Sequence, residues 1–273
     1  MPDKENGELR EEFELRGFVK LPKFFSEDEI SELREEIIKA SERLETVSTL
    51  NKDNMIFHSN LFAQSEYLQT FLSQEKIVRT LRSILGSDMW IRWDQCVAKA
   101  AGGAEFPWHQ DNAYNKLKDA HLQFWIGITE MTTENGGLWL QPGSHRMGML
   151  PHEMQGHHLA CTKLPGEGEF IAADKGDVVL FSSFMLHRTK KNNSDSDRWA
   201  YVVEYMSTDH YDPLVDPPFF VVTEDGEPRP RFVDSYEGRE KLANRLKYSG
   251  VILKTKSKRL VGRLKKSVLG GAN

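Results

Sequence analysis

Apolar residues recur at the helical period early in the chain and predict an amphipathic helix over residues 27–45. Ser26 stands just before this stretch and Glu29 three residues after Ser26, which is the pattern of a capping box at a helix N-terminus. The positions that share one face of the helix are Ile30, Leu33, Ile37 and Leu44. Before the helix, residues 18–22 alternate in a way that predicts a short strand ended by proline.

A second helix is predicted between Ser73, as its N-cap, and Gly86, which ends it. From residue 89 onward, short stretches rich in β-branched and aromatic residues replace the helical period. The predicted strands are residues 89–98, 106–111, 122–128, 138–140, 178–181 and 199–206. Residues 146–169 are predicted to be irregular and residues 207–240 extended. Many short strands after a pair of helices predict an α+β, mainly β protein whose two sheets close on each other.

Length and composition are those of one large globular domain. The chain has 273 residues, of which 39% are hydrophobic and 28% charged. We expect a single domain over residues 1–273. Its expected parts are helical support at about 1–86, a β core at about 87–210 and an extended, basic C-terminal region at 211–273.

Charge and cysteine content argue against several classes of protein. A net charge of −5 gives no reason to expect a nucleic-acid partner. Cys96 and Cys161 lie far apart without CxxC spacing, which argues against a disulfide framework and favours a reducing compartment. No apolar signal segment follows Met1, and no apolar run approaches the roughly 20 residues of a membrane span. We therefore expect a cytoplasmic protein, and nothing in the sequence indicates its oligomeric state.

The end of the chain is basic, because residues 241–273 contain ten basic residues and no acidic one. Two interpretations are open. A basic amphipathic helix would lie on an anionic membrane surface or bind an anionic partner. A terminal helix packed on the acidic body of the protein would be structural only. The second interpretation is favoured, so peripheral membrane contact is the minor expectation.

His109 and Asp111 are two metal-ligating residues that stand two positions apart. If this segment is extended, as its neighbours indicate, both side chains leave the same face of a strand, about 6–7 Å apart along the backbone. His187, just beyond the strand at 178–181, is the best third ligand. Two histidines and one carboxylate form the facial triad of non-haem Fe(II) oxygenases. The same ligands also serve zinc hydrolases, so they do not separate iron from zinc.

Arg198 favours the oxygenase over the hydrolase. It stands eleven residues after His187, and a fixed guanidinium suits the carboxylate of a dicarboxylate co-substrate. A hydrolase has little use for such a cation. The alternative role for Arg198 is a surface ion pair with Asp195 or Asp197.

These candidates belong to a longer series of short motifs. The series is His109-Gln110-Asp111, Trp125, Glu134-Asn135-Gly136-Gly137-Leu138, Pro142-Gly143-Ser144-His145, Lys175-Gly176-Asp177, His187 and Arg198. In this order, over roughly residues 89–206, it resembles the phytanoyl-CoA dioxygenase family. Arg16-Gly17-Phe18 is similar to the Asp-Gly-Phe-like segment near the family's N-terminus. Each piece alone is weak, whereas the combination is specific.

The resemblance implies a double-stranded β-helix (jelly-roll) fold and the use of Fe(II), 2-oxoglutarate and O₂. It implies iron on His109, Asp111 and His187, the distal carboxylate of 2-oxoglutarate on Arg198, and Trp125 in the wall of the co-substrate pocket. Related halogenases lack the carboxylate ligand, so the presence of Asp111 implies an oxygenase. The implied reaction is hydroxylation of an unactivated C–H bond with release of succinate and CO₂. Desaturation and ring formation are alternative outcomes.

The substrate is expected to be a small molecule. Candidate wall residues are Arg92, Gln95 and Lys99 before the His109 motif, and Asn112 and Tyr114 after it. Such polar groups favour a small polar or anionic substrate over a hydrocarbon. Two rival functions stay open. One is a metal-dependent cupin-like isomerase or hydrolase with the same three ligands, and the other is a non-catalytic jelly-roll binding module.

Overall fold

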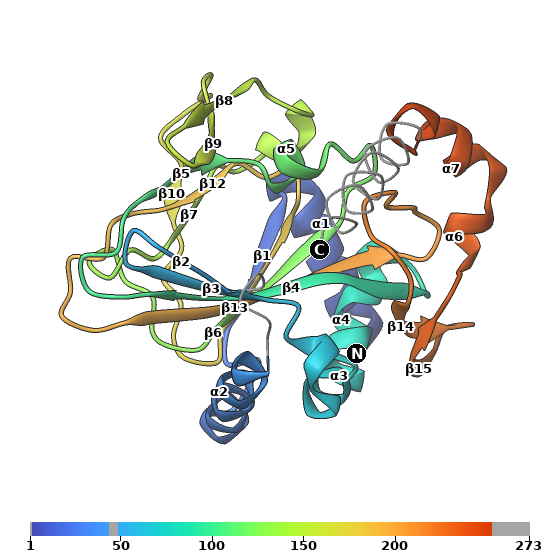
Figure 1. Cartoon of the computed structure of the whole chain (residues 1–273), viewed down its shortest axis with the longest axis horizontal. Coiled ribbons are helices and arrows are strands. Elements are labelled where there is room, and N and C mark those ends of the chain that lie inside the picture. The colour runs from blue at the N-terminus through green and yellow to red at the C-terminus, as the bar shows by residue number, and fades with distance from the viewer. Residues whose placement is uncertain (1, 44–48, 253–273) are drawn as a thin grey trace, which may run out of the picture.

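Two antiparallel β-sheets form the body of the protein, and helices cover one of them (Figure 1). The computed structural model describes residues 2–43 and 49–252. The α-helices are α1 (Pro2–Arg16), α2 (Glu27–Glu42), α3 (Glu66–Leu72), α4 (Glu75–Leu85), α5 (Asp111–Asn115), α6 (Glu237–Glu240) and α7 (Leu242–Lys247). The strands are β1 (Phe18–Leu21), β2 (Thr49–Lys52), β3 (Met55–Ser59), β4 (Met89–Lys99), β5 (Phe106–His109), β6 (Leu122–Gly127), β7 (Leu138–Leu140), β8 (His152–Gln155), β9 (His158–Cys161), β10 (Glu169–Phe170), β11 (Val178–Ser182), β12 (His187–Thr189), β13 (Arg198–Ser207), β14 (Phe219–Glu224) and β15 (Glu227–Val233).

The larger sheet has nine strands, and seven of them follow the order β1-β11-β6-β13-β4-β14-β15. In the same sheet β3 pairs with β4 and with β2. The smaller sheet has the order β10-β7-β12-β5, and β8 pairs with β9 as a separate hairpin. This arrangement is the mainly β, double-stranded β-helix architecture that the sequence and its resemblance predicted.

Alternation along the strands gives the larger sheet two different faces. On β13, Tyr201, Val203 and Tyr205 belong to a core cluster with the buried sides of α2, α3 and α4. Ala200 and Val202, which alternate with these residues, belong to a second cluster with residues of β7. Figure 1 accordingly shows α2, α3 and α4 on the side of the larger sheet that faces away from β5, β7 and β12. The second face of the larger sheet is therefore the one that meets the smaller sheet.

The capping box predicted at the first amphipathic helix is present. The hydroxyl of Ser26 accepts from the Glu29 N–H at 3.2 Å, and the Glu29 carboxylate accepts from the Ser26 N–H at 2.8 Å. The helix predicted to begin at Ser73 is α4, but its cap was predicted wrongly. Ser73 follows the end of α3, and its hydroxyl donates to the Gln69 carbonyl at 2.8 Å, so α4 begins after Gln74 instead.

Every strand predicted from the pattern exists, with small shifts at the ends. The segment predicted to be irregular, residues 146–169, contains the hairpin of β8 and β9. This hairpin lacks an alternating pattern because the side chains of β8 are largely exposed. Within residues 207–240, β14 and β15 form a further hairpin that extends the larger sheet from β4.

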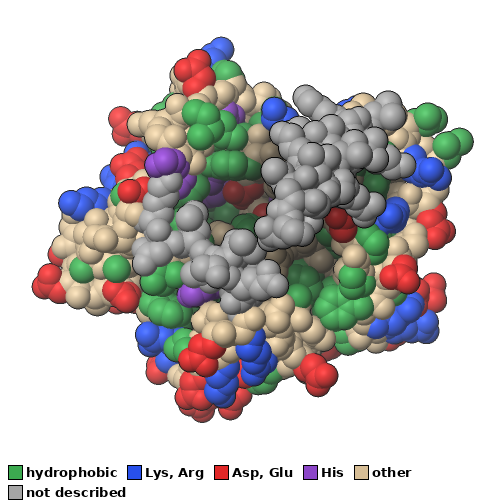
Figure 2. Space-filling view, in the orientation of Figure 1, with side chains coloured by type: hydrophobic (Ala, Val, Ile, Leu, Met, Phe, Trp, Pro, Cys, Tyr) green, Lys and Arg blue, Asp and Glu red, His purple; other side chains and the backbone are tan. Residues whose placement is uncertain are grey.

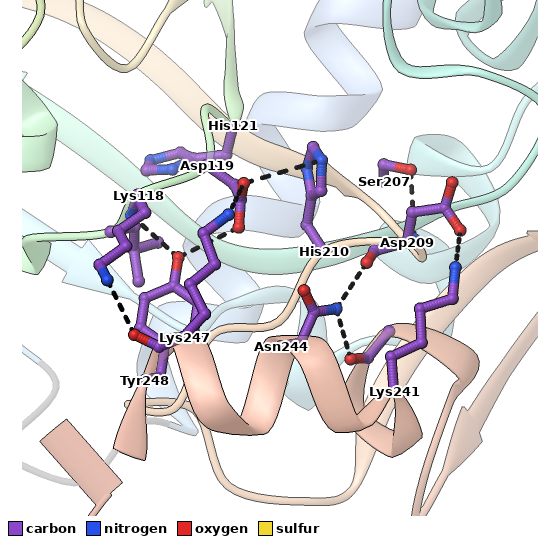
Figure 3. A network of polar contacts seen from close by, with 12 residues as sticks. Lys118, Asp119, His121, Ser207, Asp209, His210, Lys241, Asn244, Lys247 and Tyr248 are labelled. Carbon is purple, nitrogen blue, oxygen red and sulfur yellow. Dashed lines mark hydrogen bonds and ion pairs between the residues drawn. The ribbon is translucent and has the colours of Figure 1, made fainter. Parts of the chain in front are cut away.

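Charged side chains tie α7 to the body of the protein (Figure 3). Lys247 forms an ion pair with Asp119, and Lys241 forms another with Asp209 at 2.6 Å. The remainder of the basic C-terminal segment, for which a membrane-binding helix was considered, lies outside the described residues. Among the helices that the structure describes, none has the length and apolar character needed to cross a membrane.

We expect Gly176→Ala to destabilise the protein more than Gly86→Ala. Both glycines have positive φ, +90° and +91°, so alanine costs about 1 kcal/mol or more at either position. A Cβ at Gly176 would lie 2.3 Å from the Phe25 carbonyl oxygen, whereas nothing lies within 4 Å at Gly86. The extra clash is expected to lower the free energy of unfolding by a further ~2 kcal/mol in urea titrations. Equal losses for the two variants would contradict this packing.

Candidate metal centre

The three predicted metal ligands meet where β5 and β12 pair. His109 ends β5 and lies opposite His187, the first residue of β12. The Asp111 Oδ1 atom lies 3.5 Å from the Nε2 atom of His109 and 3.6 Å from that of His187. The three ligand atoms lie within 4.8 Å of one another, which is compact enough for one ion to reach all three.

Asp111 reaches this position by a turn of the chain and not by strand alternation. The predicted strand over 106–111 ends at His109. Gln110 is still extended, with φ −115° and ψ 132°, and Asp111 is the first residue of α5. The expectation that His109 and Asp111 share one face of a strand was therefore wrong, although their side chains do converge.

Backbone carbonyls orient both histidine rings toward Asp111. The Nδ1 atom of His109 lies 2.8 Å from the Pro107 carbonyl, and that of His187 lies 3.0 Å from the Met185 carbonyl. Because a carbonyl can only accept, each Nδ1 carries the proton and each Nε2 presents its lone pair to the centre. Burial, followed by repulsion from His109, lowers the pKa of His187 to about 4. The imidazole is thus held in the neutral form that ligates metals.

The Asp111 carboxylate is held in its charged form. Burial opposes its ionisation, but interaction with the protonated forms of His187 and His109 outweighs burial and holds the pKa of Asp111 below its usual value. Two imidazoles and one carboxylate around a single point fit a divalent ion without thiolate ligands.

Gln110, between the two ligands of the motif, is fully buried and binds the surrounding loops. Its side-chain N–H groups donate to the carbonyls of Gly148 (2.9 Å) and Phe184 (2.6 Å). Its side-chain oxygen accepts from the Leu150 N–H at 2.9 Å, and its own backbone N–H donates to His152 Nε2 at 3.1 Å. Gln110 and His152 had no predicted role, and their contacts fix the backbone between the two ligands.

Arg198 is completely buried. Its Nη2 atom has one long contact, 3.4 Å to the Gly136 carbonyl, and its Nε and Nη1 atoms have no hydrogen-bond partner among residues 2–43 and 49–252. Burial lowers the pKa of Arg198 to about 10, so the side chain remains charged at neutral pH. This burial is incompatible with the alternative of a surface ion pair. A buried guanidinium with unpaired N–H groups is costly unless an anion binds there.

Lys99 lies directly across from Arg198 in the pairing of β4 with β13. Its Nζ atom donates to the Thr189 hydroxyl at 2.9 Å and to the Lys190 carbonyl at 2.6 Å. Burial, and then repulsion from Arg198, lower the pKa of Lys99 to about 6. Lys99 is therefore mainly neutral at neutral pH, and the Arg198 guanidinium carries the positive charge at this end of the site.

A cavity of about 860 Å³ joins the triad to Arg198 and Trp125. Figure 2 shows histidine and acidic side chains inside the hollow on this face of the molecule. Of the five predicted wall residues, Arg92, Gln95 and Tyr114 line the cavity. Lys99 and Asn112 are not among its described lining residues, and the Asn112 side chain instead donates to the Leu117 carbonyl at 3.1 Å.

Two further polar residues, Gln123 and Glu204, line the cavity and were not predicted from the sequence. Both lie in strands whose neighbouring residues are mostly apolar, which is the pattern of a core strand. Trp125 lies beneath the Arg198 guanidinium, 5.8 Å from the ring centroid to Cζ. The site thus has a cationic end at Arg198, a metal centre, and a third polar region around Glu204.

Comparisons with known proteins identify a family for the chain. The phytanoyl-CoA dioxygenase (PhyH) family model matches residues 13–200. A probable alpha-ketoglutarate-dependent hypophosphite dioxygenase of Stutzerimonas stutzeri is 25% identical over 225 residues, covering 74% of this chain and 79% of that protein. Ectoine dioxygenase of Stutzerimonas stutzeri (strain A1501) is 26% identical over 271 residues and covers 84% of each.

A solved structure shares the fold at low sequence identity. The epimerase SnoN, crystallised with Fe³⁺, alpha ketoglutarate and nogalamycin RO, superposes with a TM-score of 0.66 at 15% identity. The match covers 86% of this chain and 98% of SnoN.

We expect Gln110→Ala to weaken metal binding although Gln110 is not a ligand. Loss of its three side-chain hydrogen bonds would free the backbone that places His109 and Asp111, and changes of this kind cost ~10–100-fold in metal affinity. The measurement is an anaerobic Fe(II) titration. Gln155→Ala, an exposed position on β8, is the control and should leave the affinity unchanged. Equal affinities for all three proteins would show that Gln110 does not position the ligands.

Proposed function

The chain belongs to the phytanoyl-CoA dioxygenase family, and we propose that it hydroxylates an unactivated C–H bond of a small molecule at the centre formed by His109, Asp111 and His187. Membership makes the protein an Fe(II)- and 2-oxoglutarate-dependent dioxygenase. The observation that carries the proposed site is the meeting of the compact triad and the unpaired Arg198 guanidinium in one cavity.

In this proposal His109, Asp111 and His187 hold the iron on one face and leave the opposite face open to the cavity. The loaded iron, together with 2-oxoglutarate and O₂, supplies the oxidising power for C–H hydroxylation and releases succinate and CO₂. The protein contributes fixed geometry. Because both imidazole rings are anchored through Nδ1, the ligands need little rearrangement when the metal binds.

Arg198 is proposed to bind the distal carboxylate of 2-oxoglutarate. Its Nε and Nη1 N–H groups, which lack partners in the described part of the chain, would donate to this carboxylate. Trp125 would form the wall beneath the co-substrate. Lys99, predicted from the sequence as a substrate residue, instead donates hydrogen bonds to Thr189 and to the Lys190 carbonyl.

We also propose that the chain is a single catalytic domain that works in the cytoplasm on a small molecule. One core cluster joins the helices to the larger sheet, which supports one domain. Cys96 and Cys161 are both free, as expected in a reducing compartment. The similar proteins named above are dioxygenases of small molecules, hypophosphite and ectoine.

The rival functions make different demands on the same residues. A cupin-like isomerase or hydrolase would need no 2-oxoglutarate, and the buried Arg198 guanidinium would then have no anion to bind. A binding module without catalysis would not need three metal-ligating side chains that converge within the cavity. The state of Arg198 and the triad therefore supports the oxygenase.

We expect Arg198→Ala to weaken 2-oxoglutarate binding by ~100-fold, because truncating one side of a buried charge pair costs several kcal/mol. The measurement is the visible charge-transfer band of the anaerobic Fe(II) protein, titrated with 2-oxoglutarate. Arg229→Ala, at an exposed arginine of β15, is the matched control and should titrate like the unaltered protein. If the iron-loaded unaltered protein shows no band, the proposed function fails. If the unaltered protein shows the band and Arg198→Ala titrates at the same 2-oxoglutarate concentrations, the assignment of Arg198 fails.

We expect Asp111→Ala to lower Fe(II) affinity by more than ~100-fold, because it removes a proposed ligand. Mutation of residues that only support the ligands costs up to ~100-fold. Anaerobic equilibrium dialysis with Fe(II) measures this directly and needs no substrate. Glu153→Ala, an exposed acid on β8, controls for loss of negative charge. Unchanged iron binding in Asp111→Ala would favour the non-catalytic binding module.

A further inference from the structure

One row of side chains crosses four strands of the larger sheet below the metal centre. In this row Trp93 of β4 lies opposite Glu204 of β13, Glu204 opposite Gln123 of β6, and Gln123 opposite Phe181 of β11. All four line the cavity. The Phe181 ring lies 4.9 Å from the ring of His187, between centroids. The row therefore places one carboxylate between two aromatic rings, next to the metal ligands.

A β-bulge adds Arg92 to this row. Glu204 pairs with Trp93, but the next residue, Tyr205, pairs with Ile91, so Arg92 is the extra residue of β4. Bulges redirect side chains and are common beside active sites. As a result two successive residues, Arg92 and Trp93, both line the cavity instead of alternating across the sheet.

Arg92 is held between two carboxylates. Its Nε atom donates to Asp212 at 2.5 Å, and its Nη1 atom forms an ion pair with Glu204. Gln123 donates its side-chain N–H to the other oxygen of Glu204 at 3.0 Å. All four side chains are at most 8% exposed. Burial opposes ionisation of Glu204, but attraction to Arg92 outweighs it and holds the pKa of Glu204 far below its usual value.

The charges in this cluster do not balance. One guanidinium faces two carboxylates, so Arg92, Glu204 and Asp212 together carry one negative charge. The ring of His121 (Figure 3) also lies near Glu204, with Nε2 3.5 Å from Oε2. His121 is completely buried, and the surplus negative charge is counted on Arg92, Glu204 and Asp212 alone.

We propose that this cluster is the substrate-recognition end of the cavity and that it binds a protonated amine, with Glu204 as the counter-charge and Trp93 and Phe181 as aromatic walls. The inference rests on the proposed function and narrows its substrate to an organic cation with an apolar body. A buried carboxylate surplus attracts a cation and repels an anion. Aromatic faces add cation–π attraction.

The rest of the cavity fits an apolar body attached to such an amine. Much of its lining is apolar, with Met55, Phe57, Val97, Phe106 and Val202 among the lining residues. Its volume of about 860 Å³ is at the upper end of the range for small-molecule sites. This assignment differs from the small polar or anionic substrate expected from the sequence, because Arg92 is already paired with two carboxylates and has no excess charge to offer an anion.

The test uses three probes that share a phenyl body and differ in the head group: 2-phenylethylamine, 2-phenylethanol and phenylacetate. Each is titrated at neutral pH into the anaerobic protein loaded with Fe(II) and 2-oxoglutarate. We expect the amine to bind at least ~10-fold more tightly than phenylacetate, and the alcohol to have an intermediate affinity. The nuclear magnetic relaxation of the probe protons is measured with paramagnetic Fe(II) and with diamagnetic Zn(II) in the same protein. Faster relaxation with Fe(II) would place the probe beside the metal. Equal binding of the three probes, or preference for phenylacetate, would overturn the proposal.

Two variants each remove one negative charge. Glu204→Gln keeps the shape of the side chain in the cavity wall, and Asp212→Asn acts at the Nε atom of Arg92. Each is expected to reduce the preference for the amine over phenylacetate by ~10-fold. The two carboxylates have different hydrogen-bond partners, because Asp212 Oδ1 accepts from the Leu214 N–H at 2.7 Å and Glu204 Oε1 accepts from Gln123. An effect common to both variants would therefore come from the lost charge. An unchanged preference in both would assign the cluster a structural role only.

Failure of this inference is distinct from failure of the proposed function. The charge-transfer band of the unaltered protein reports iron and 2-oxoglutarate without any probe. A normal band with no head-group preference overturns the amine site alone. Absence of the band from the fully iron-loaded protein overturns both.

Discussion

The antiparallel pairing of β5 with β12 is the constraint on which the proposed metal centre depends. It places His109 opposite His187, and carbonyls two residues before each histidine orient the rings through Nδ1. A slip of one residue in this register would send one histidine to the opposite face of the small sheet. Asp111 then needs only the short turn at Gln110 to reach both Nε2 atoms. The buried contacts of Gln110 stabilise that turn, so the loops at 148–150 and 184 help to form the site.

The larger sheet supports these polar groups by separating its two faces. Its outer face packs against α2, α3 and α4 in an apolar core, and burial of this surface offsets the cost of the charged groups on the inner face. On β13 alone, the inner face carries Arg198, Val202 and Glu204, whereas Tyr201, Val203 and Tyr205 lie in the core. One strand thus contributes both to the stability of the fold and to both polar ends of the cavity.

Features that depend on neighbouring residues in the chain could be predicted, and features that depend on strand register could not. The capping box at Ser26 and the strands follow from local spacing, whereas the triad residues were predicted from their residue types and from the order of the motifs along the chain. The helix α1 was missed because its apolar stripe is thin, with Phe13 buried and Leu9 partly buried. Glu204 and Gln123 looked like interruptions in core strands, and Lys99 and Asn112 like wall residues. The actual positions of these residues depend on contacts between segments that are distant in the chain. The position of Arg92 depends on a β-bulge that no sequence pattern indicates.

The same register also separates the two charged ends of the site. Arg198 and Glu204 are six residues apart on β13, about 20 Å at the usual rise per residue. The triad faces this strand from the smaller sheet. A dicarboxylate is attracted to the end with Arg198 and repelled from the end with Glu204 and Asp212, while an organic cation has the opposite preference. In the proposed assignment, charge therefore directs 2-oxoglutarate and an amine substrate to different ends of one cavity, and each can occupy its own end without displacing the other.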